Sequence, residues 1–339
     1  MTERPKHPAG VEGILYDSVQ GAWLGELERL KAHGRHVSGV IDPLSIGSNF
    51  GAAVRDTIEM TASSFCLANP LDRLTVSSTI RKFDLGFAVG SFLSSLCESN
   101  DVDLIAFYNP KGREFAGHDG HLTASLGARL YQDGAQLERA VERLQADPTT
   151  RRALVQIHLP SDLLGSARDT SCVGSLHFLL RESQLHCIAH MRSQSAFRVF
   201  PYDLFVLTMI HESVATAIST KVGSYYHIAN SMHIYDDEVS VVERLLRDPP
   251  TRPLSMSQMS PSSLEVRQKL LSAERAIRAQ LREHSAQIVD VNAFGLGPYW
   301  TRLLAVLVVA VKGRLGVGLT REDVEGVAPE FRYSMVSTG

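Results

Sequence analysis

The sequence predicts a single α+β domain, spanning residues 1–339, around one large twisted mixed sheet. Segments with the apolar patterns of β-strands follow one another in the middle of the chain. Segments with helical periodicity lie on both sides of them in the sequence, an order typical of helices packed against one sheet. No low-complexity linker or internal repeat divides the sequence, so we expect one domain rather than several.

Each element is predicted from its spacing of apolar residues and from the residues at its ends. Gly34 follows the first helical segment, as glycine commonly does, and Pro201 opens a later one because its fixed φ suits a first helical turn. The second helical segment is unusually apolar, which predicts burial on most sides. The expected helices span 20–33, 84–97, 136–145, 202–219, 236–246, 264–284 and 299–311, and the expected strands span 153–158, 175–180, 185–190 and 223–234.

Composition excludes several functional classes. With 339 residues, 44% of them hydrophobic and 21% charged, the chain is ordinary for a globular protein. A net charge of -3 argues against a surface for the backbone of DNA or RNA, although a single nucleotide needs only a local basic pocket. The N-terminal residues lack an apolar signal core, and the apolar stretch 303–311 is shorter than the about 20 residues that cross a bilayer. We expect a soluble protein without a membrane partner.

The four cysteines show no CxxC spacing, so neither a zinc site nor a thioredoxin motif is indicated. They are expected to be reduced thiols in a cytoplasmic protein. Cys172 at the edge of a predicted strand can be a small core residue. It differs from the other cysteines because arginines occur near it in the motif series, and a nearby positive charge favours the nucleophilic thiolate form.

Arginines and polar residues surround this cysteine in sequence. Arg151 and Arg152 open a strand, where they are either solvated or clamp a phosphate with their guanidinium groups. Arg192 is followed by Ser193 and further polar residues, a pattern more typical of a site loop than of a core. We therefore regard the arginines and Ser193 as candidate phosphate ligands.

Three further residues are candidates for binding a base or a sugar. Asp203 lies in the first turn of a predicted helix, where acidic residues are favoured even without a function. His233 and Tyr235 alternate with apolar residues and so share one face of a strand. That face is either simply solvated or binds a ribose.

Taken in order, these segments resemble thymidylate synthase and its pyrimidine hydroxymethylase relatives. The strongest match is 144–152, Leu-Gln-Ala-Asp-Pro-Thr-Thr-Arg-Arg, followed by Cys172 with Phe178 behind it. Arg192-Ser193, the base-reading segment 201–203 and the sugar-binding segment 233–235 complete the series. The resemblance is strongest over 136–238 and weak in the N-terminal 80 and C-terminal 90 residues or so, and it implies a three-layer homodimer.

The resemblance also implies a mechanism for a one-carbon transferase. Cys172 would add to C6 of a pyrimidine nucleoside monophosphate, so that C5 attacks the methylene of 5,10-methylenetetrahydrofolate. Arg192 and Ser193 would hold the phosphate, and His233 and Tyr235 the sugar hydroxyl. Arg151 and Arg152 would reach the nucleotide of the partner subunit.

Asp203 predicts which base is used. Uridylate enzymes of the family carry asparagine at this position, whereas the cytidylate hydroxymethylases carry aspartate. A carboxylate accepts a hydrogen bond from the 4-amino group of cytosine. Against O4 of uracil it places one acceptor opposite another, and no hydrogen bond forms. One such mismatch costs about 1–3 kcal/mol, or about 10- to 100-fold in preference. We therefore expect hydroxymethylation of CMP or dCMP, with CMP and an antibiotic-type pathway suggested only by the composition.

The sequence departs from the family mainly at residues for folate. Val173 replaces a histidine, His177 a glutamine and Ser195 a pterin-binding aspartate. The family's core glutamate has no clear counterpart, since Ser91 aligns best and Glu98 comes later. The folate-packing tryptophans and the closing C-terminal tail are absent, and 45–52 with Arg55 replaces the phosphate loop. Two alternatives therefore remain: altered C5 chemistry without folate, and a non-catalytic nucleotide-binding protein.

Overall fold

The structure is a computed structural model that describes residues 13–41, 54–76, 78–117, 119–132, 134–163, 170–249, 255–282, 290–316 and 318–331. Its centre is a mixed sheet, as predicted, with strand order β1-β3-β8-β6-β5-β4; β2 pairs with β3 and β7 with β8. The strands are β1 (Ile14–Tyr16), β2 (Arg35–Ile41), β3 (Val54–Leu67), β4 (Leu154–Gln156), β5 (Val173–Arg181), β6 (Gln184–Met191), β7 (Gln194–Ser195) and β8 (Lys221–Tyr235).

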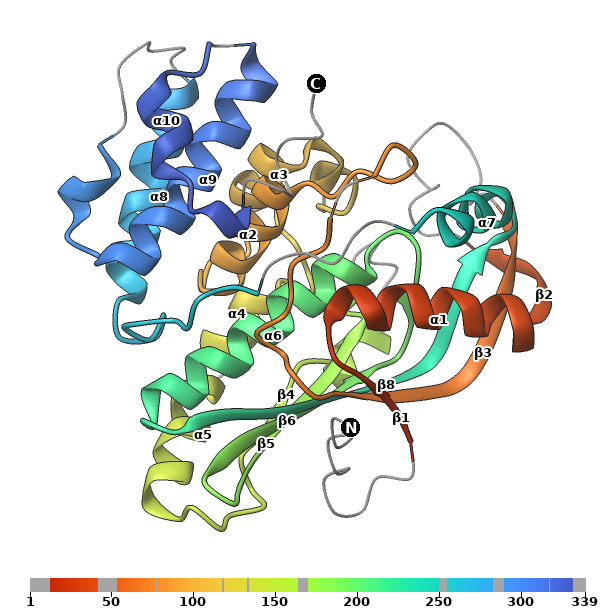
Figure 1. Cartoon of the computed structure of the whole chain (residues 1–339). Coiled ribbons are helices and arrows are strands. Elements are labelled where there is room, and N and C mark those ends of the chain that lie inside the picture. The colour runs from red at the N-terminus through yellow and green to blue at the C-terminus, as the bar shows by residue number, and fades with distance from the viewer. Residues whose placement is uncertain are drawn as a thin grey trace, which may run out of the picture.

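Helices cover one face of this sheet in two layers (Figure 1). In the first layer α1 packs on β3 and α6 on β6 and β8, while α2 and α9 form the second layer beyond α6. The α-helices are α1 (Val19–His33), α2 (Leu85–Ser95), α3 (Asp103–Tyr108), α4 (Leu126–Tyr131), α5 (Gln136–Ala146), α6 (Phe200–Ala217), α7 (Val239–Arg247), α8 (Arg267–Arg282), α9 (Pro298–Leu315) and α10 (Arg321–Gly326), and the short 3-10 helices are η2 (Pro110–Glu114), η3 (Pro160–Leu163), η4 (Asp236–Glu238) and η5 (Val291–Phe294).

The burial of α2 that its apolar sequence predicts is confirmed. Its residues pack between α6, α9 and α3, and Phe92 is stacked on Trp300 of α9. Gly86 and Gly90 permit the close approach, because an added Cβ would collide with Ala310 of α9 and with the ring of Tyr108 in α3. Asp84 begins the helix by accepting a hydrogen bond from Phe87 N–H at 2.9 Å.

The two faces of the sheet differ in burial. Along β6, Leu185, Cys187 and Ala189 are buried toward α6, whereas Ile188 on the opposite face is only half-buried. The same alternation leaves Ile228 of β8 half-buried beside it. This second face of the sheet therefore carries apolar side chains that the described part of this chain covers only in part.

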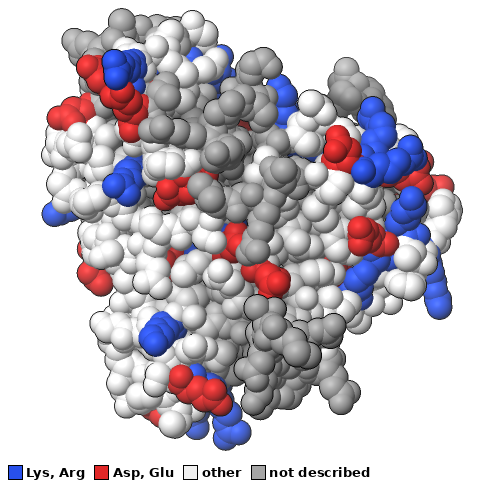
Figure 2. Space-filling model, in the orientation of Figure 1, with Lys and Arg blue, Asp and Glu red and all other residues white. Residues whose placement is uncertain are grey.

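Surface charge and helix length bear on which partners the chain could contact. Basic and acidic side chains are mixed on the face shown in Figure 2, where the described residues form no broad basic surface. None of the described helices has the length and apolar content that crossing a bilayer requires.

Candidate active site

The predicted site residues, apart from two arginines, gather at one end of the sheet. Cys172 immediately precedes β5, and Arg192 immediately follows β6; the strands are antiparallel neighbours, with Val173 opposite Met191. β8 runs parallel to β6 and extends past it, so that His233 lies opposite Ser195 of β7. The chain then enters α6 at the same end.

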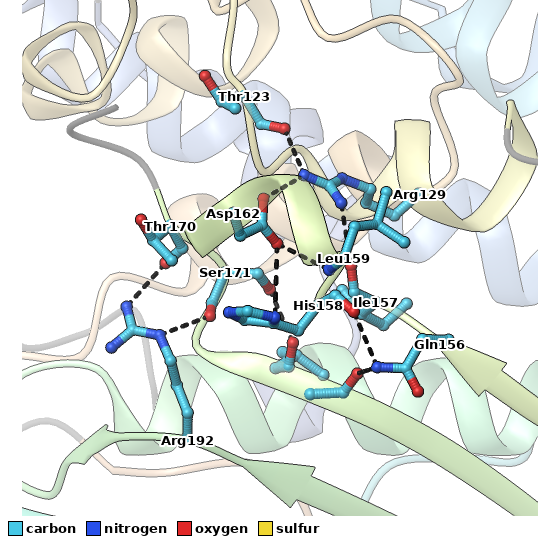
Figure 3. A network of polar contacts seen from close by, with 12 residues as sticks. Thr123, Arg129, Gln156, Ile157, His158, Leu159, Asp162, Thr170, Ser171 and Arg192 are labelled. Atoms are coloured by element: carbon cyan, nitrogen blue, oxygen red, sulfur yellow. Dashed lines mark hydrogen bonds and ion pairs between the residues drawn. The ribbon is translucent and has the colours of Figure 1, made fainter. Parts of the chain in front are cut away.

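Arg192 holds the segment that carries Cys172 (Figure 3). Its Nε donates to Ser171 O at 2.8 Å and its Nη2 to Thr170 O at 2.9 Å. Nη2 also lies 3.8 Å from the Cys172 Sγ. Cys172 is exposed, whereas Cys66 and Cys187 are buried, and burial raises the pKa of both buried thiols. Cys97 is half-buried, so Cys172 is the most exposed of the four cysteines.

A buried ion pair stabilises the chain next to this thiol (Figure 3). Arg129 Nη2 lies 2.7 Å from Asp162 Oδ1, and Asp162 Oδ2 accepts from Leu159 N–H at 2.9 Å. Burial of Asp162 opposes its ionisation, but the Leu159 hydrogen bond and the Arg129 guanidinium outweigh it and lower the pKa. Gln156 Nε2 then donates to Gly174 O at 3.2 Å, which ties this network to the start of β5.

Asp203 is half-buried in the first turn of α6, which begins at Phe200 with Pro201 as its second residue. Burial raises the pKa of Asp203 to about 6, although a hydrogen bond from Gln194 opposes the shift. Gln194 Nε2 donates to Asp203 Oδ2 at 2.8 Å. The carboxyl group can therefore gain a proton close to neutral pH.

His233 and Tyr235 share one face of β8, as their alternation predicts, with ring centroids 5.4 Å apart. Tyr235 also contacts two guanidinium groups, with Arg55 Cζ 4.1 Å and Arg198 Cζ 4.3 Å from its ring centroid. Arg198 forms an ion pair with Glu238, whose other oxygen accepts from Tyr235 N–H at 3.0 Å. Arg55 forms an ion pair with Asp237, so both arginines beside Tyr235 have a carboxylate partner.

Sequence reasoning assigned no role to several residues that shape this site. Arg81 donates to Arg198 O at 2.8 Å, and Trp23 Nε1 donates to Ala196 O at 3.0 Å, so both hold the turn before α6. Gln194 lies within the polar run after Arg192 and Arg198 follows Gln194 by four residues, but only the folded chain shows what they contact. The contact of Arg81 with Arg198 joins residues 117 positions apart in sequence and leaves no local signal.

Arg151 and Arg152 are not brought to Cys172 within one chain. Both are exposed at the start of β4, the last strand of the sheet. Arg151 O contacts His177 Nε2 at 3.1 Å, in the middle of β5, whereas Cys172 precedes the first residue of that strand. Ser193 is half-buried between β6 and β7, at the end of the sheet where Cys172 lies.

Three positions at which the sequence departs from the family pattern are described by the structure. Ser91 Oγ is enclosed in α2 without a hydrogen-bond partner among the described residues, and Glu98 is exposed. Ser195 Oγ accepts from Arg198 N–H at 3.4 Å. Residues 45–52 and the C-terminal segment 334–339 lie outside the described residues.

Fold and site together define an α+β protein with a cysteine–arginine site at one end of a mixed sheet. A family model described as thymidylate synthase matches residues 97–271, and the chain belongs to this family. It is 30% identical over 185 residues to a deoxyuridylate hydroxymethyltransferase of Bacillus phage SP01, covering 50% of this chain and 48% of that protein.

Other matches agree with this membership. A thymidylate synthase of Listeria monocytogenes is 24% identical over 130 residues, covering 38% of this chain and 41% of the relative. The chain spans about half the length, or less, of these curated relatives. Thermostable thymidylate synthase A from Bacillus subtilis has the same fold, with a TM-score of 0.56 and 15% identity over 69% of this chain and 86% of that chain.

Proposed function

We propose that the protein is a cytidylate 5-hydroxymethyltransferase, which converts CMP or dCMP to the 5-hydroxymethyl nucleotide. The observation that carries this proposal is Asp203, a protonatable carboxyl group at the start of α6 beside the Cys172 end of the sheet. The phage relative is named for hydroxymethylation of deoxyuridylate, which supports the same C5 chemistry. The proposal of cytosine starts from Asp203, the carboxyl group expected to face the base.

Cys172 supplies the nucleophile in this mechanism. Its sulfur adds to C6 of the base, and C5 gains the electron density needed to form a new carbon–carbon bond. In the complete reaction the C5 proton is lost, the reduced folate would depart as the leaving group, and water supplies the hydroxyl group on the transferred carbon. Expulsion of the same sulfur then restores the aromatic ring. Arg192 is adjacent to the thiol and has further N–H groups with which to bind phosphate, so one side chain can orient both reactants.

Asp203 reads the base edge in this proposal. One oxygen accepts from the 4-amino group, and the other shares a proton with N3, for which a pKa of about 6 is well suited. His233 and Tyr235 bind the sugar hydroxyl. They would meet the 3′ hydroxyl of either nucleotide series, and both CMP and dCMP are accordingly candidates.

Two half-buried aromatic rings lie near β7 and the start of α6. Tyr202 is stacked on Phe83, with ring centroids 4.8 Å apart, Phe197 lies under Arg81, and Ser195 adds a hydroxyl group at the end of β7. Trp23 and Trp300 are buried and are not available for stacking. Phe197, Tyr202 and Ser195 would hold 5,10-methylenetetrahydrofolate, which supplies the one-carbon unit when it is bound.

We also propose that residues 1–339 form a single domain that acts as a homodimer. One continuous apolar core joins the described residues from α1 to α9, which supports one domain. The less buried face of the sheet, on which Ile188 and Ile228 lie among polar residues such as His190, supports a second copy as its partner. In such a dimer, Arg151 and Arg152 would bind the phosphate in the partner's site.

Mass spectrometry of nucleotide products tests the activity. The protein is incubated with CMP, dCMP, UMP or dUMP, with and without methylenetetrahydrofolate, beside Cys172→Ser as the inactive control. We expect a gain of about 30 mass units, that of CH2O, on a cytidine nucleotide and only with the folate. Product from a uridine nucleotide alone would refute the substrate, and a product formed without folate would favour altered C5 chemistry.

A further inference from the structure

Gln194 contacts the base-reading carboxyl group from the side of the sheet. It is 1% exposed, lies in β7 opposite Met232 and donates to Asp203 Oδ2 at 2.8 Å. Its own Oε1 is buried without a hydrogen-bond partner among the described residues. An unmatched buried acceptor costs about 1–3 kcal/mol, so stability alone is a poor reason for a glutamine here.

A protonatable aspartate does not by itself distinguish cytosine from uracil. A charged carboxylate only accepts hydrogen bonds, but the neutral acid carries one donor and one acceptor oxygen. With the proton on the oxygen facing N3, the acid matches cytosine. With the proton on the oxygen facing C4, it donates to O4 and accepts from N3–H, and so matches uracil. Asp203 gains a proton near neutral pH, so its two oxygens must be made unequal.

The Gln194 amide makes them unequal. An N–H donor is held best by the unprotonated oxygen, so the bond to Oδ2 keeps the proton on Oδ1. We infer that Gln194 is a specificity-determining positioning residue: it fixes Oδ2 as the acceptor for the 4-amino group and leaves Oδ1–H for N3. This role, which rests on the proposed cytidylate substrate, makes the pair rather than Asp203 alone the base reader.

The other titratable groups that interact with Asp203 do not decide which of its oxygens carries the proton. Tyr225 of β8 interacts electrostatically with Asp203 and with Cys187 of β6. Burial raises the pKa of Tyr225 and of Cys187, so both stay neutral between pH 5 and pH 8. Among the described residues, Gln194 is the side chain that donates a hydrogen bond to the Asp203 carboxyl group.

Binding of CMP and UMP without folate tests the role of Gln194. Calorimetry would give the two dissociation constants for the wild-type protein, Gln194→Met and Gln20→Met. Gln20 is the matched control, a second buried glutamine whose Oε1 accepts from Val76 N–H at 3.0 Å. We expect a CMP preference of about tenfold or more in the wild type and Gln20→Met, and of about threefold or less in Gln194→Met.

Gln194→Asn provides the same test with a smaller side chain that keeps its amide but does not reach Asp203. The unaltered protein provides a further check, since a fixed proton order predicts that UMP stays weak relative to CMP at pH 5 as well as at pH 8. The nucleotide phosphate titrates alike in both ligands, so the ratio isolates the base.

The outcomes separate the role of Gln194 from the substrate. Equal weakening of CMP and UMP in a folded Gln194 variant would show a merely structural residue and overturn the inference. A gain of UMP relative to CMP at pH 5 in the wild type would also overturn it. In both cases a wild-type preference for CMP at pH 8 would leave the proposed substrate intact. A wild-type preference for UMP at pH 8 would refute both.

Discussion

Asp203→Asn is expected to change how the stability of the protein depends on pH. Burial raises the pKa of Asp203 from an ordinary 3.8 to about 6. Between these values the folded protein binds a proton that the unfolded chain releases. The contribution of Asp203 to the free energy of unfolding therefore falls as pH rises through this range. Asparagine is uncharged at every pH and removes this dependence.

The expected magnitude follows from the gap between the two pKa values. At about 1.36 kcal/mol per pKa unit, the ionised carboxylate costs about 3 kcal/mol of stability above pH 7. About half of this, ~1.5 kcal/mol, is lost between pH 5 and pH 8, because the unfolded chain is already largely ionised at pH 5. The stability of Asp203→Asn relative to the wild type should rise by that amount over the same interval.

Denaturant unfolding followed by circular dichroism at pH 5 and pH 8 measures this difference. Histidines and other carboxylates titrate alike in both proteins and cancel in the comparison. Asp236→Asn, which alters an exposed aspartate, controls for the loss of a negative charge. A relative stability that is the same at both pH values within about 0.5 kcal/mol would refute the burial of an ionisable carboxyl group here.

Three further predictions concern the nucleophile, the dimer and a buried histidine. Cys172→Ser should abolish product formation while nucleotide affinity, measured by calorimetry, stays within about threefold; measurable turnover would remove the nucleophile. Cys172→Ser subunits mixed with equal amounts of an Arg151→Ala/Arg152→Ala double variant should recover about a quarter of wild-type activity, because half the dimers are mixed and each has one intact site; no recovery would argue against shared sites. Burial lowers the pKa of His227 to about 3, so this residue should cost the wild type about 2 kcal/mol as pH falls from 7 to 5. His227→Phe should lack this loss in the same unfolding experiment, whereas equal acid sensitivity would contradict it.

The central strands and α6 were predictable because their signals are local. Alternation along β6 records burial against α6 on one side only, and Pro201 sets the helix start. The acidic segment after β8 was also predicted, but it begins as the 3-10 helix η4 before α7 continues. Thymidylate synthase family membership followed from the order of short motifs within this predictable region.

The long strand β3 was missed for a physical reason. The pairing register with β8 is the same before and after Ala62, so Thr57 and Phe65 lie on the same face of the strand. Polar residues nevertheless occupy that face up to Ser63 and apolar ones follow, whereas Asp56 and Ser64 interrupt the apolar residues of the other face. No single period-2 apolar pattern therefore spans the strand. β2 is interrupted in its pairing between Val37 and Val40, where Gly39 has a φ of 77°.

The site residues likewise divide into those with a local sequence signal and those placed by contacts between distant segments. Cys172, Arg192, Asp203, His233 and Tyr235 are found at the positions expected from motif order, although their roles remain predictions. The contacts of Gln194, Arg81 and Arg198 depend on which segments meet in space. Spacing in the sequence does not contain that information.

In the proposed function, base choice and C5 chemistry depend on separate parts of this site. Cys172 and Arg192 are held by β5, β6 and the Asp162 network. Asp203 and Gln194 depend instead on the turn from β7 into α6, which Trp23 and Arg81 fix from other elements. A relative named for deoxyuridylate can therefore share the fold and the thiol chemistry while differing at the base reader. Changing the order of donors and acceptors at this turn is enough to exchange the 4-amino for the 4-oxo group, and the thiol need not move.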